Sequence, residues 1–333
     1  MMQDDPTPPE SAPPDAMARF RRWAAIAVAI AVIGWVGYAL VRGFSETGRE
    51  LVGFPWLLSI PVLLLTLVNY GLRYLKWHYL LGRLGIHIEH RHDAPIFLAG
   101  LAMVISPAKA GEVVKPWLVR TISGAPMART IPALVAERGT DGIAVVALAA
   151  IGVSTYASEA TSVIWLTIAA IVGVLVVIAV EPLSRGLIGV VAALPLVGGL
   201  ASRLDDAYSA TRTVLAPVPL VVTVALSMVA WFAECIGAWL IFQGLQTTAT
   251  LDQSTFLYAF STVFGAPSPG GLGMADVALA EGALQIVDGI SEGQALAASL
   301  LVRLATLWFG VVLGAFALLR MERVIDDARS SRE

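Results

Sequence analysis

The sequence predicts an all-α integral membrane protein, with about six transmembrane helices and two re-entrant helical hairpins inserted from opposite faces as an inverted repeat. The first observation is composition: 57% of the 333 residues are hydrophobic, 14% are charged, and the mean hydropathy is +0.76. The second is a series of long apolar runs, and the third is a pair of Pro/Gly-rich interruptions within such runs. Together they exclude an ordinary soluble protein.

A continuous apolar run needs at least about 17–25 residues to cross a bilayer, and six runs reach this length. They lie near residues 23–41, 55–81, 130–156, 162–180, 217–245 and 293–320. The Pro-rich, acidic segment 1–22 is predicted to be a disordered cytosolic tail, and 321–333 a second cytosolic tail. Segment 181–215 is less hydrophobic and carries scattered charges, so we expect an interfacial linker there. Residues 23–320 then form one transmembrane domain.

Two further apolar stretches are broken in the middle, and we name them hairpin one (95–120) and hairpin two (253–288). Proline removes a backbone donor and clustered glycine favours irregular backbone, so each break ends a membrane helix. The residues expected to shape the breaks are Pro107, Gly111, Pro267, Pro269, Gly270, Gly271 and Gly273. Paired broken helices in two halves of a membrane protein point to a transport site.

The distribution of Lys and Arg predicts the topology. With the N-terminus inside, the outer loops carry only Arg42 and Arg49. Treating the hairpins as full spans would place five arginines outside: Arg120, Arg129, Arg185, Arg203 and Arg212. The positive-inside rule therefore favours hairpins, with both termini cytosolic in the cell membrane. Hairpin one then enters from the cytosol and hairpin two from the outside.

Charged and helix-breaking residues recur in the same order in the two halves. The markers are a charge in a first span, a proline in the hairpin and an arginine in the next span: Arg73, Pro107 and Arg138, then Glu234, Pro269 and Arg303. The intervals from the first charge to the proline and from the proline to the arginine are 34 and 31 positions in the first half, and 35 and 34 in the second. With hairpins of opposite orientation, this spacing predicts an inverted repeat of about 55–156 and about 217–320.

Ionisable residues within spans cost about 3 kcal/mol each, so they usually face a cavity or one another. They are Arg73, Lys76, Glu137, Arg138, Asp141, Glu234 and Arg303. Lys76 is interpreted as an interfacial residue whose ammonium reaches the headgroup layer. Glu137, Arg138 and Arg303 are predicted to join a polar interior network. The sequence leaves open whether that network binds substrate or holds the bundle together.

Hairpin one is cationic. The lysines of the chain are Lys76, Lys109 and Lys115, and all lie around this hairpin. With Arg73 and Arg138 they could form a basic vestibule open to the cytosolic leaflet. Helix N-termini at the break would add partial positive charge suited to a phosphate. The alternative is that Lys109 and Lys115 only follow the positive-inside rule.

Hairpin two is acidic, with Asp276, Glu281 and Asp288. Three roles are open for Asp276: accepting a proton, binding a cation, or pairing with Arg303. We expect Arg303 to lie against hairpin two and pair with Asp276 or Glu234, because an unpaired arginine inside a membrane is costly.

The sequence lacks the patterns expected for disulfide bonding, ATP hydrolysis, enzymatic catalysis or metal binding. Cys235 is the only cysteine, so no intrachain disulfide is expected. Nucleotide-binding, hydrolase and zinc-protease motifs are absent, which argues against an ATP-driven pump or an enzyme, and no cofactor is predicted. His87, His90 and His92 are interpreted as part of an exposed, titrating loop in preference to a metal site.

Four motifs in order carry a resemblance. They are Asn-Tyr-Gly-Leu-Arg-Tyr (69–74), Ser-Pro-Ala-Lys-Ala-Gly-Glu (106–112), Glu-Arg-Gly-Thr-Asp (137–141) and Pro-Ser-Pro-Gly-Gly-Leu-Gly (267–273), followed by Arg303. From about residue 24 to 320 the chain resembles the flippase-like transmembrane region of lysylphosphatidylglycerol synthases and its stand-alone relatives. In two-domain synthases this region is taken to move the aminoacylated lipid between leaflets, so the resemblance implies lipid translocation. It implies no lysyl transfer, because residues 321–333 are too few for the soluble aminoacyl-transferase domain. Asp276 stands near where relatives tend to have a glutamate.

We therefore predict a membrane lipid translocase that moves an anionic or phosphate-bearing lipid, or a lipid-linked headgroup, between leaflets. The candidate substrate-binding residues are Arg73, Lys109, Glu112, Lys115, Glu137, Arg138, Asp276 and Arg303. Expected partners are phospholipids or polyprenyl-phosphate-linked lipids and a separate lipid-modifying enzyme, with no nucleic acid. Two alternatives stay open: an ion-coupled transporter of a small solute, and a non-transporting membrane partner of a lipid-modifying enzyme.

Overall fold

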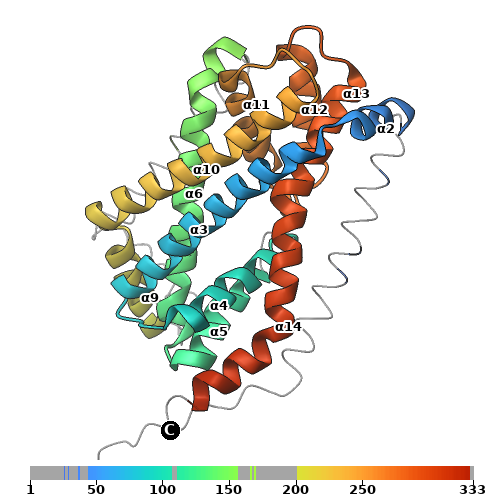
Figure 1. The fold of residues 1–333 in the computed structure, drawn as a ribbon. Coiled ribbons are helices and arrows are strands. Elements are labelled where there is room, and N and C mark those ends of the chain that lie inside the picture. The colour runs from blue at the N-terminus through green and yellow to red at the C-terminus, as the bar shows by residue number, and fades with distance from the viewer. Residues whose placement is uncertain are drawn as a thin grey trace, which may run out of the picture.

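The computed structural model describes residues 44–106, 111–156 and 201–330, with isolated positions elsewhere. Within these ranges the chain forms helices joined by turns, without strands (Figure 1). The first half contains α2 (Phe44–Gly53), η1 (Trp56–Leu58), α3 (Ser59–Arg83), α4 (His90–Ala102), α5 (Val114–Ser123) and α6 (Met127–Tyr156). The second half contains α9 (Ala201–Val214), α10 (Pro217–Gly244), α11 (Leu251–Gly265), η5 (Pro269–Gly271), α12 (Met274–Ile286), α13 (Glu292–Arg303), η6 (Leu304–Trp308) and α14 (Phe309–Ser330).

Some predictions fall outside the described residues. They concern the tail 1–22, the spans 23–41 and 162–180, residues 181–200 of the predicted interfacial linker, and the tip of hairpin one with Pro107 and Lys109. Within the described residues, α14 continues to Ser330, so most of the segment predicted as a C-terminal tail is helical.

Three continuous helices are long and apolar enough to cross a membrane: Trp56–Arg83, Pro217–Gly244 and Glu292–Ala328. They contain or match the predicted spans 55–81, 217–245 and 293–320. α6 contains the predicted span 130–156. Its 30 residues correspond to about 45 Å, more than the hydrocarbon thickness of about 30 Å. The last span is interrupted at η6, one turn of π-helix.

Pairs of short helices occupy the positions of the two hairpins. α4 and α5 have 13 and 10 residues, and α11 and α12 have 15 and 13. At about 1.5 Å per residue, none of them covers a hydrocarbon core of about 30 Å. Between α11 and α12, the φ angles of Gly270, Gly271 and Gly273 are 60°, 75° and 77°. Only glycine adopts this left-handed backbone without strain, so the turn depends on these three positions.

Each half of the chain packs a long helix against the hairpin of the other half, and we call α6–α11 and α14–α4 the exchanged pairs. α3 packs against α10, α6 packs against α11 of hairpin two, and α14 packs against α4 of hairpin one. Polar contacts join both exchanged pairs: Tyr156 Oη is hydrogen-bonded to Asp252, and His92 Nε2 lies 3.1 Å from Asp327 Oδ2. Hairpin one lies toward one end of the bundle and hairpin two toward the other (Figure 1). Each hairpin is therefore held by a long helix of the opposite half.

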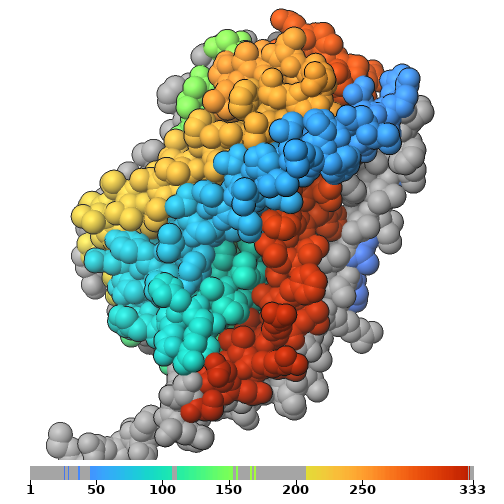
Figure 2. Space-filling model, viewed as in Figure 1, coloured from blue at the N-terminus to red at the C-terminus, as the bar shows by residue number. Residues whose placement is uncertain are grey.

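The face shown in Figure 2 is crossed by α3, with α10 and α14 on either side. These helices expose large apolar side chains: Ile60, Leu64, Leu67, Leu75, Val218, Val221, Val229, Val312, Phe316 and Leu319. Such a surface suits contact with lipid. α14 approaches α4 closely through Gly314, where an added Cβ would meet the backbone N of Ala102 and lie 2.7 Å from the carbonyl O of Leu98.

Candidate functional site

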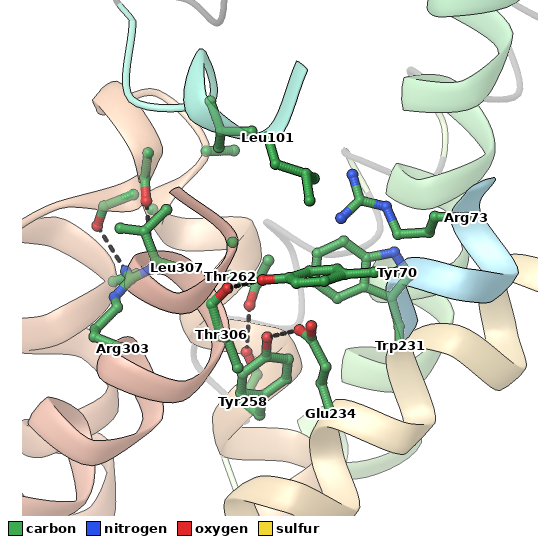
Figure 3. A pocket seen from close by; sticks show the side chains of 17 residues that line it. Tyr70, Arg73, Leu101, Trp231, Glu234, Tyr258, Thr262, Arg303, Thr306 and Leu307 are labelled. Atoms are coloured by element: carbon green, nitrogen blue, oxygen red, sulfur yellow. Dashed lines mark hydrogen bonds between the residues drawn. The ribbon is translucent and has the colours of Figure 1, made fainter. Parts of the chain in front are cut away.

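A polar cavity of about 110 Å³ lies where α3, α10, hairpin two and the last long helix meet. Its polar lining comes from all of these elements: Tyr70, Arg73, Glu234, Tyr258, Thr262, Arg303 and Thr306. Leu101 and Val104 of hairpin one complete the wall, so both hairpins border the same cavity. Figure 3 shows Arg73 and Arg303 on opposite sides, with Glu234 and Tyr258 between them.

Arg303 fastens α13 to hairpin two. Its Nε donates to Asp276 Oδ1 at 2.6 Å, Nη2 donates to the carbonyl O of Gly271 at 2.9 Å, and Nη1 donates to the carbonyl O of Gly270 at 3.3 Å. Asp276 Oδ2 also accepts from the backbone N–H of Gly273 at 2.8 Å, at the start of α12. The expected pairing of Arg303 with a carboxylate is thus present, and the partner is Asp276.

Arg138 makes the corresponding contact in the first half. Its Nε lies 2.7 Å from Oε2 of Glu112, which follows the break of hairpin one. Arg138 Nη2 also donates to Glu137 Oε1 at 3.1 Å. Each hairpin therefore carries a carboxylate that is paired with an arginine of the next long helix in its own half.

Lys76 lies at the centre of a buried polar network. Its ammonium donates to Asp141 Oδ1 at 2.5 Å, Ser227 Oγ at 2.8 Å and the carbonyl O of Glu137 at 3.0 Å. The side chain is 0% exposed. The interpretation of Lys76 as an interfacial residue is therefore wrong. Lys76 lies near the end of its span, which suggested an interface, but its side chain lies on the face of α3 that packs against α6 and α10.

Lys115 is also an interior residue. Its ammonium pairs with the Glu137 carboxylate and lies 4.1 Å from the ring centroid of Trp77 and 5.2 Å from that of Phe97. Its side chain is 1% exposed. The structure therefore places Lys115 in the buried network, and it does not line an open basic vestibule.

Arg73 connects this network to the cavity. Its Nε lies 3.4 Å from Asp141 Oδ2, and its Nη2 lies 3.9 Å from Glu137 Oε1. Nε has no hydrogen-bond partner among the described residues, and the guanidinium lies 5.7 Å from the ring centroid of Trp231. In the described part of the chain, the network holds four cations and three carboxylates: Arg73, Lys76, Lys115 and Arg138 with Glu112, Glu137 and Asp141. The loosely paired Arg73 therefore provides positive charge at the cavity wall.

Sequence reasoning found the charged residues but missed their aromatic neighbours. Tyr258 Oη donates to the Glu234 carboxylate, and Tyr70 Oη donates to the carbonyl O of Thr306. Trp231 forms another wall of the cavity. For the two tyrosines, the available signal was a hydroxyl on an aromatic ring within an apolar stretch, because a buried tyrosine hydroxyl usually has a hydrogen-bond partner.

The predicted site residues form two groups. The buried network contains Arg73, Glu112, Lys115, Glu137 and Arg138. Asp276 and Arg303 form the ion pair that holds hairpin two against α13, and we call such a pair between an arginine and a hairpin carboxylate a clamp. Of the predicted substrate-binding residues that the structure describes, Arg73 and Arg303 line the cavity, together with the hairpin-shaping Gly270 and Gly271.

The fold and this site define a helical membrane protein with a charged internal cavity between two halves. A family model described as "Lysylphosphatidylglycerol synthase TM region" matches residues 22–314, and the chain belongs to this family. The chain is also 24% identical, over 327 residues, to a "UPF0104 membrane protein" of Methanothermobacter thermautotrophicus. That alignment covers 88% of this chain and 94% of the relative.

Proposed function

We propose that this protein translocates an anionic, phosphate-bearing lipid or lipid-linked headgroup between membrane leaflets without changing it covalently. The observation that carries the proposal is the cavity between Arg73 and Arg303, bordered by both hairpins. Guanidinium groups offer forked donors that match phosphate oxygens. Broken backbone within a membrane is tolerated where it lines such a cavity.

The size of the cavity favours a headgroup as the occupant. About 110 Å³ is well below the roughly 300–1,000 Å³ typical of pockets that enclose a whole drug-sized ligand. A lipid would place its phosphate here and keep its chains elsewhere. Occupancy of the cavity would also distinguish the protein from a non-transporting scaffold.

An apolar cavity of about 340 Å³ next to the polar one supports a lipid over a small solute. Its walls include Phe54, Val62 and Ile241, together with Leu304 and Trp308 of η6. The intervening η6 residues Thr306 and Leu307 line the polar cavity instead. One π-helical turn thus separates a site for a phosphate from a site for a hydrocarbon chain, and π-helical turns often occur at functional sites.

The exchanged helix packing supports the topology that we propose: six spans and two hairpins inserted from opposite faces of the cell membrane, with cytosolic termini. Equivalent elements of each half occupy equivalent positions against the other half, as in inverted-repeat transporters. The paired clamps, Arg138 with Glu112 and Arg303 with Asp276, would let each hairpin move with its long helix. The cavity would then open alternately to the two leaflets.

A leaflet-sidedness assay in liposomes tests the proposal. Purified protein is reconstituted with labelled phosphatidylglycerol, phosphatidylcholine or a polyprenyl phosphate, and impermeant reagents report headgroup exposure over time. We expect faster exchange of the anionic lipids and unchanged lipid masses. Arg73→Gln should slow exchange about tenfold or more, the equivalent of one charge-assisted hydrogen bond.

Arg49→Gln is the matched control, because the Arg49 side chain is 77% exposed and lies outside the cavity. Equal exchange of phosphatidylcholine and phosphatidylglycerol, or wild-type exchange by Arg73→Gln, would overturn the proposal. Uptake of free phosphate without lipid exchange would instead support the solute transporter.

A further inference from the structure

Glu234 and Asp276 are the two carboxylates that the sequence offers as partners of Arg303, and the structure separates their roles. Both carboxylate oxygens of Asp276 already accept hydrogen bonds, one from Arg303 and one from the N–H of Gly273. Glu234 is 4% exposed and has no cation within 4 Å among the described residues. Its carboxylate accepts a hydrogen bond from Tyr258 and faces the polar cavity (Figure 3). Glu234 is therefore the carboxylate that remains available to exchange a proton.

The surroundings of Glu234 hold both signs of charge. The titratable and charged groups that face it come from α3, α6, α11 and α13, and its neighbour on α10 is a thiol: Tyr70, Arg73, Asp141, Tyr258, Arg303 and Cys235. Each of the arginines is already paired with another carboxylate, Arg73 with Asp141 and Arg303 with Asp276. An anionic headgroup entering the cavity would therefore contact two guanidinium groups and the carboxylate of Glu234, which has no paired cation.

We propose that Glu234 takes up one proton as an anionic headgroup binds, so that lipid translocation is coupled to protons; this inference rests on the proposed function. An ionised carboxylate offers only acceptor oxygens and repels a phosphate. A protonated one donates an O–H bond to a phosphate oxygen while Tyr258 continues to donate to its other oxygen. The proton comes from solvent on the side where the headgroup enters. It forms an O–H bond on the carboxylate and leaves when the headgroup departs on the other side.

Thermodynamic linkage gives the size of the effect. Because headgroup and proton favour each other's binding, the apparent affinity for the headgroup rises as pH falls, by up to about tenfold per pH unit. Linkage is reciprocal, so headgroup binding must also draw protons from solution.

The experiment uses the purified full chain and dihexanoylphosphatidylglycerol, a soluble phosphodiester. A diester lacks the second ionisation near pH 6 of a phosphate monoester, so the charge of the probe does not change with pH. Affinity is measured by calorimetry between about pH 5 and 8, and proton uptake is measured with an indicator dye in weak buffer. We expect wild-type affinity to rise as pH falls, with up to one proton taken up per bound lipid. Glu234→Gln should bind tightly at every pH and take up none.

Asp288→Asn is the control, because it removes an exposed carboxylate remote from the cavity and should follow the wild type. Tyr258→Phe is a second variant for the case in which Glu234→Gln does not fold, and it should move the midpoint of the pH dependence upward. If Glu234→Gln keeps the pH dependence, or if the wild type binds lipid without taking up a proton, proton coupling through Glu234 is wrong, while the proposed anionic-lipid function is unaffected. Absence of binding by wild type and Glu234→Gln at every pH would sink the proposed anionic-lipid function as well.

Discussion

Arg138 Nε lies 2.7 Å from Glu112 Oε2, and this ion pair joins the long helix α6 to hairpin one. The pair between Arg303 and Asp276, at 2.6 Å, joins α13 to hairpin two. In a membrane interior such pairs are costly to separate, because neither charge finds water. Each hairpin is thus tied by charge to its own half and by packing to a long helix of the other half.

Arg303→Ala should lower stability and transport together. The change removes the cation paired with Asp276 and the donor to the carbonyl groups of Gly270 and Gly271, and breaking a buried pair costs about 3–5 kcal/mol. Thermal unfolding in detergent should show a clearly lower Tm, whereas the exposed Arg320→Ala should not. The charge reversal Asp276→Arg with Arg303→Asp should restore Tm only in part, since an aspartate cannot donate to the two carbonyls. An Arg303→Ala protein with wild-type Tm would contradict this role.

Lys76 and Asp141 should prove strongly coupled. Lys76→Met leaves Asp141 with longer ion pairs from Arg73 at 3.4 Å and Arg138 at 3.7 Å, so we expect a loss of about 3 kcal/mol. Asp141→Asn should be similarly harmful. Combining the two should cost at least about 1 kcal/mol less than the sum, as measured by a double-mutant cycle of unfolding free energies. Additive effects would show that the ion pair contributes little.

How far the sequence predicts this structure depends on the range of the interaction. Hydrophobic run length and backbone chemistry are local, so the spans of α3 and α10 and the glycine turn at Gly270–Gly273 follow from the chain itself. The pairing of Arg303 follows from the cost of an isolated charge in lipid. Lys115 shows the limit: a ten-residue helix has several possible buried faces. The choice depends on Trp77, Phe97 and Glu137, which come from three other helices.

Gly314→Ala should destabilise the exchanged pair of α14 and α4. The new Cβ would meet backbone atoms of Ala102 and Leu98, which cannot rotate away as a side chain can. Overpacking of this kind typically costs about 1–3 kcal/mol. Gly71→Ala is the control, because no atom lies within 4 Å of its added Cβ and alanine favours a helix. Equal Tm values for the two variants would contradict the close approach.

Labelling of single cysteines tests the opposite orientation of the hairpins. In a Cys235→Ser background, Arg129→Cys follows hairpin one and Asp288→Cys lies at the end of hairpin two, and both positions are exposed. An impermeant maleimide added to intact cells should modify position 288 and leave position 129 unmodified until the cells are opened. Modification of position 129 from outside would mean that hairpin one crosses the membrane.

Arg138 offers a way to separate headgroup binding from movement, because it clamps hairpin one but does not line the cavity. Arg138→Lys keeps the positive charge beside Glu112 and loses the planar fork that also reaches Glu137. We expect its affinity for a soluble anionic lipid to stay within about twofold of wild type, while leaflet exchange slows by about tenfold, the equivalent of one charge-assisted hydrogen bond. Arg73→Gln should show the reverse order, with affinity falling at least as much as exchange. Measuring both quantities for both variants in the same lipid therefore distinguishes a clamp from a ligand. Loss of affinity in Arg138→Lys equal to its loss of exchange would instead make Arg138 part of the binding site.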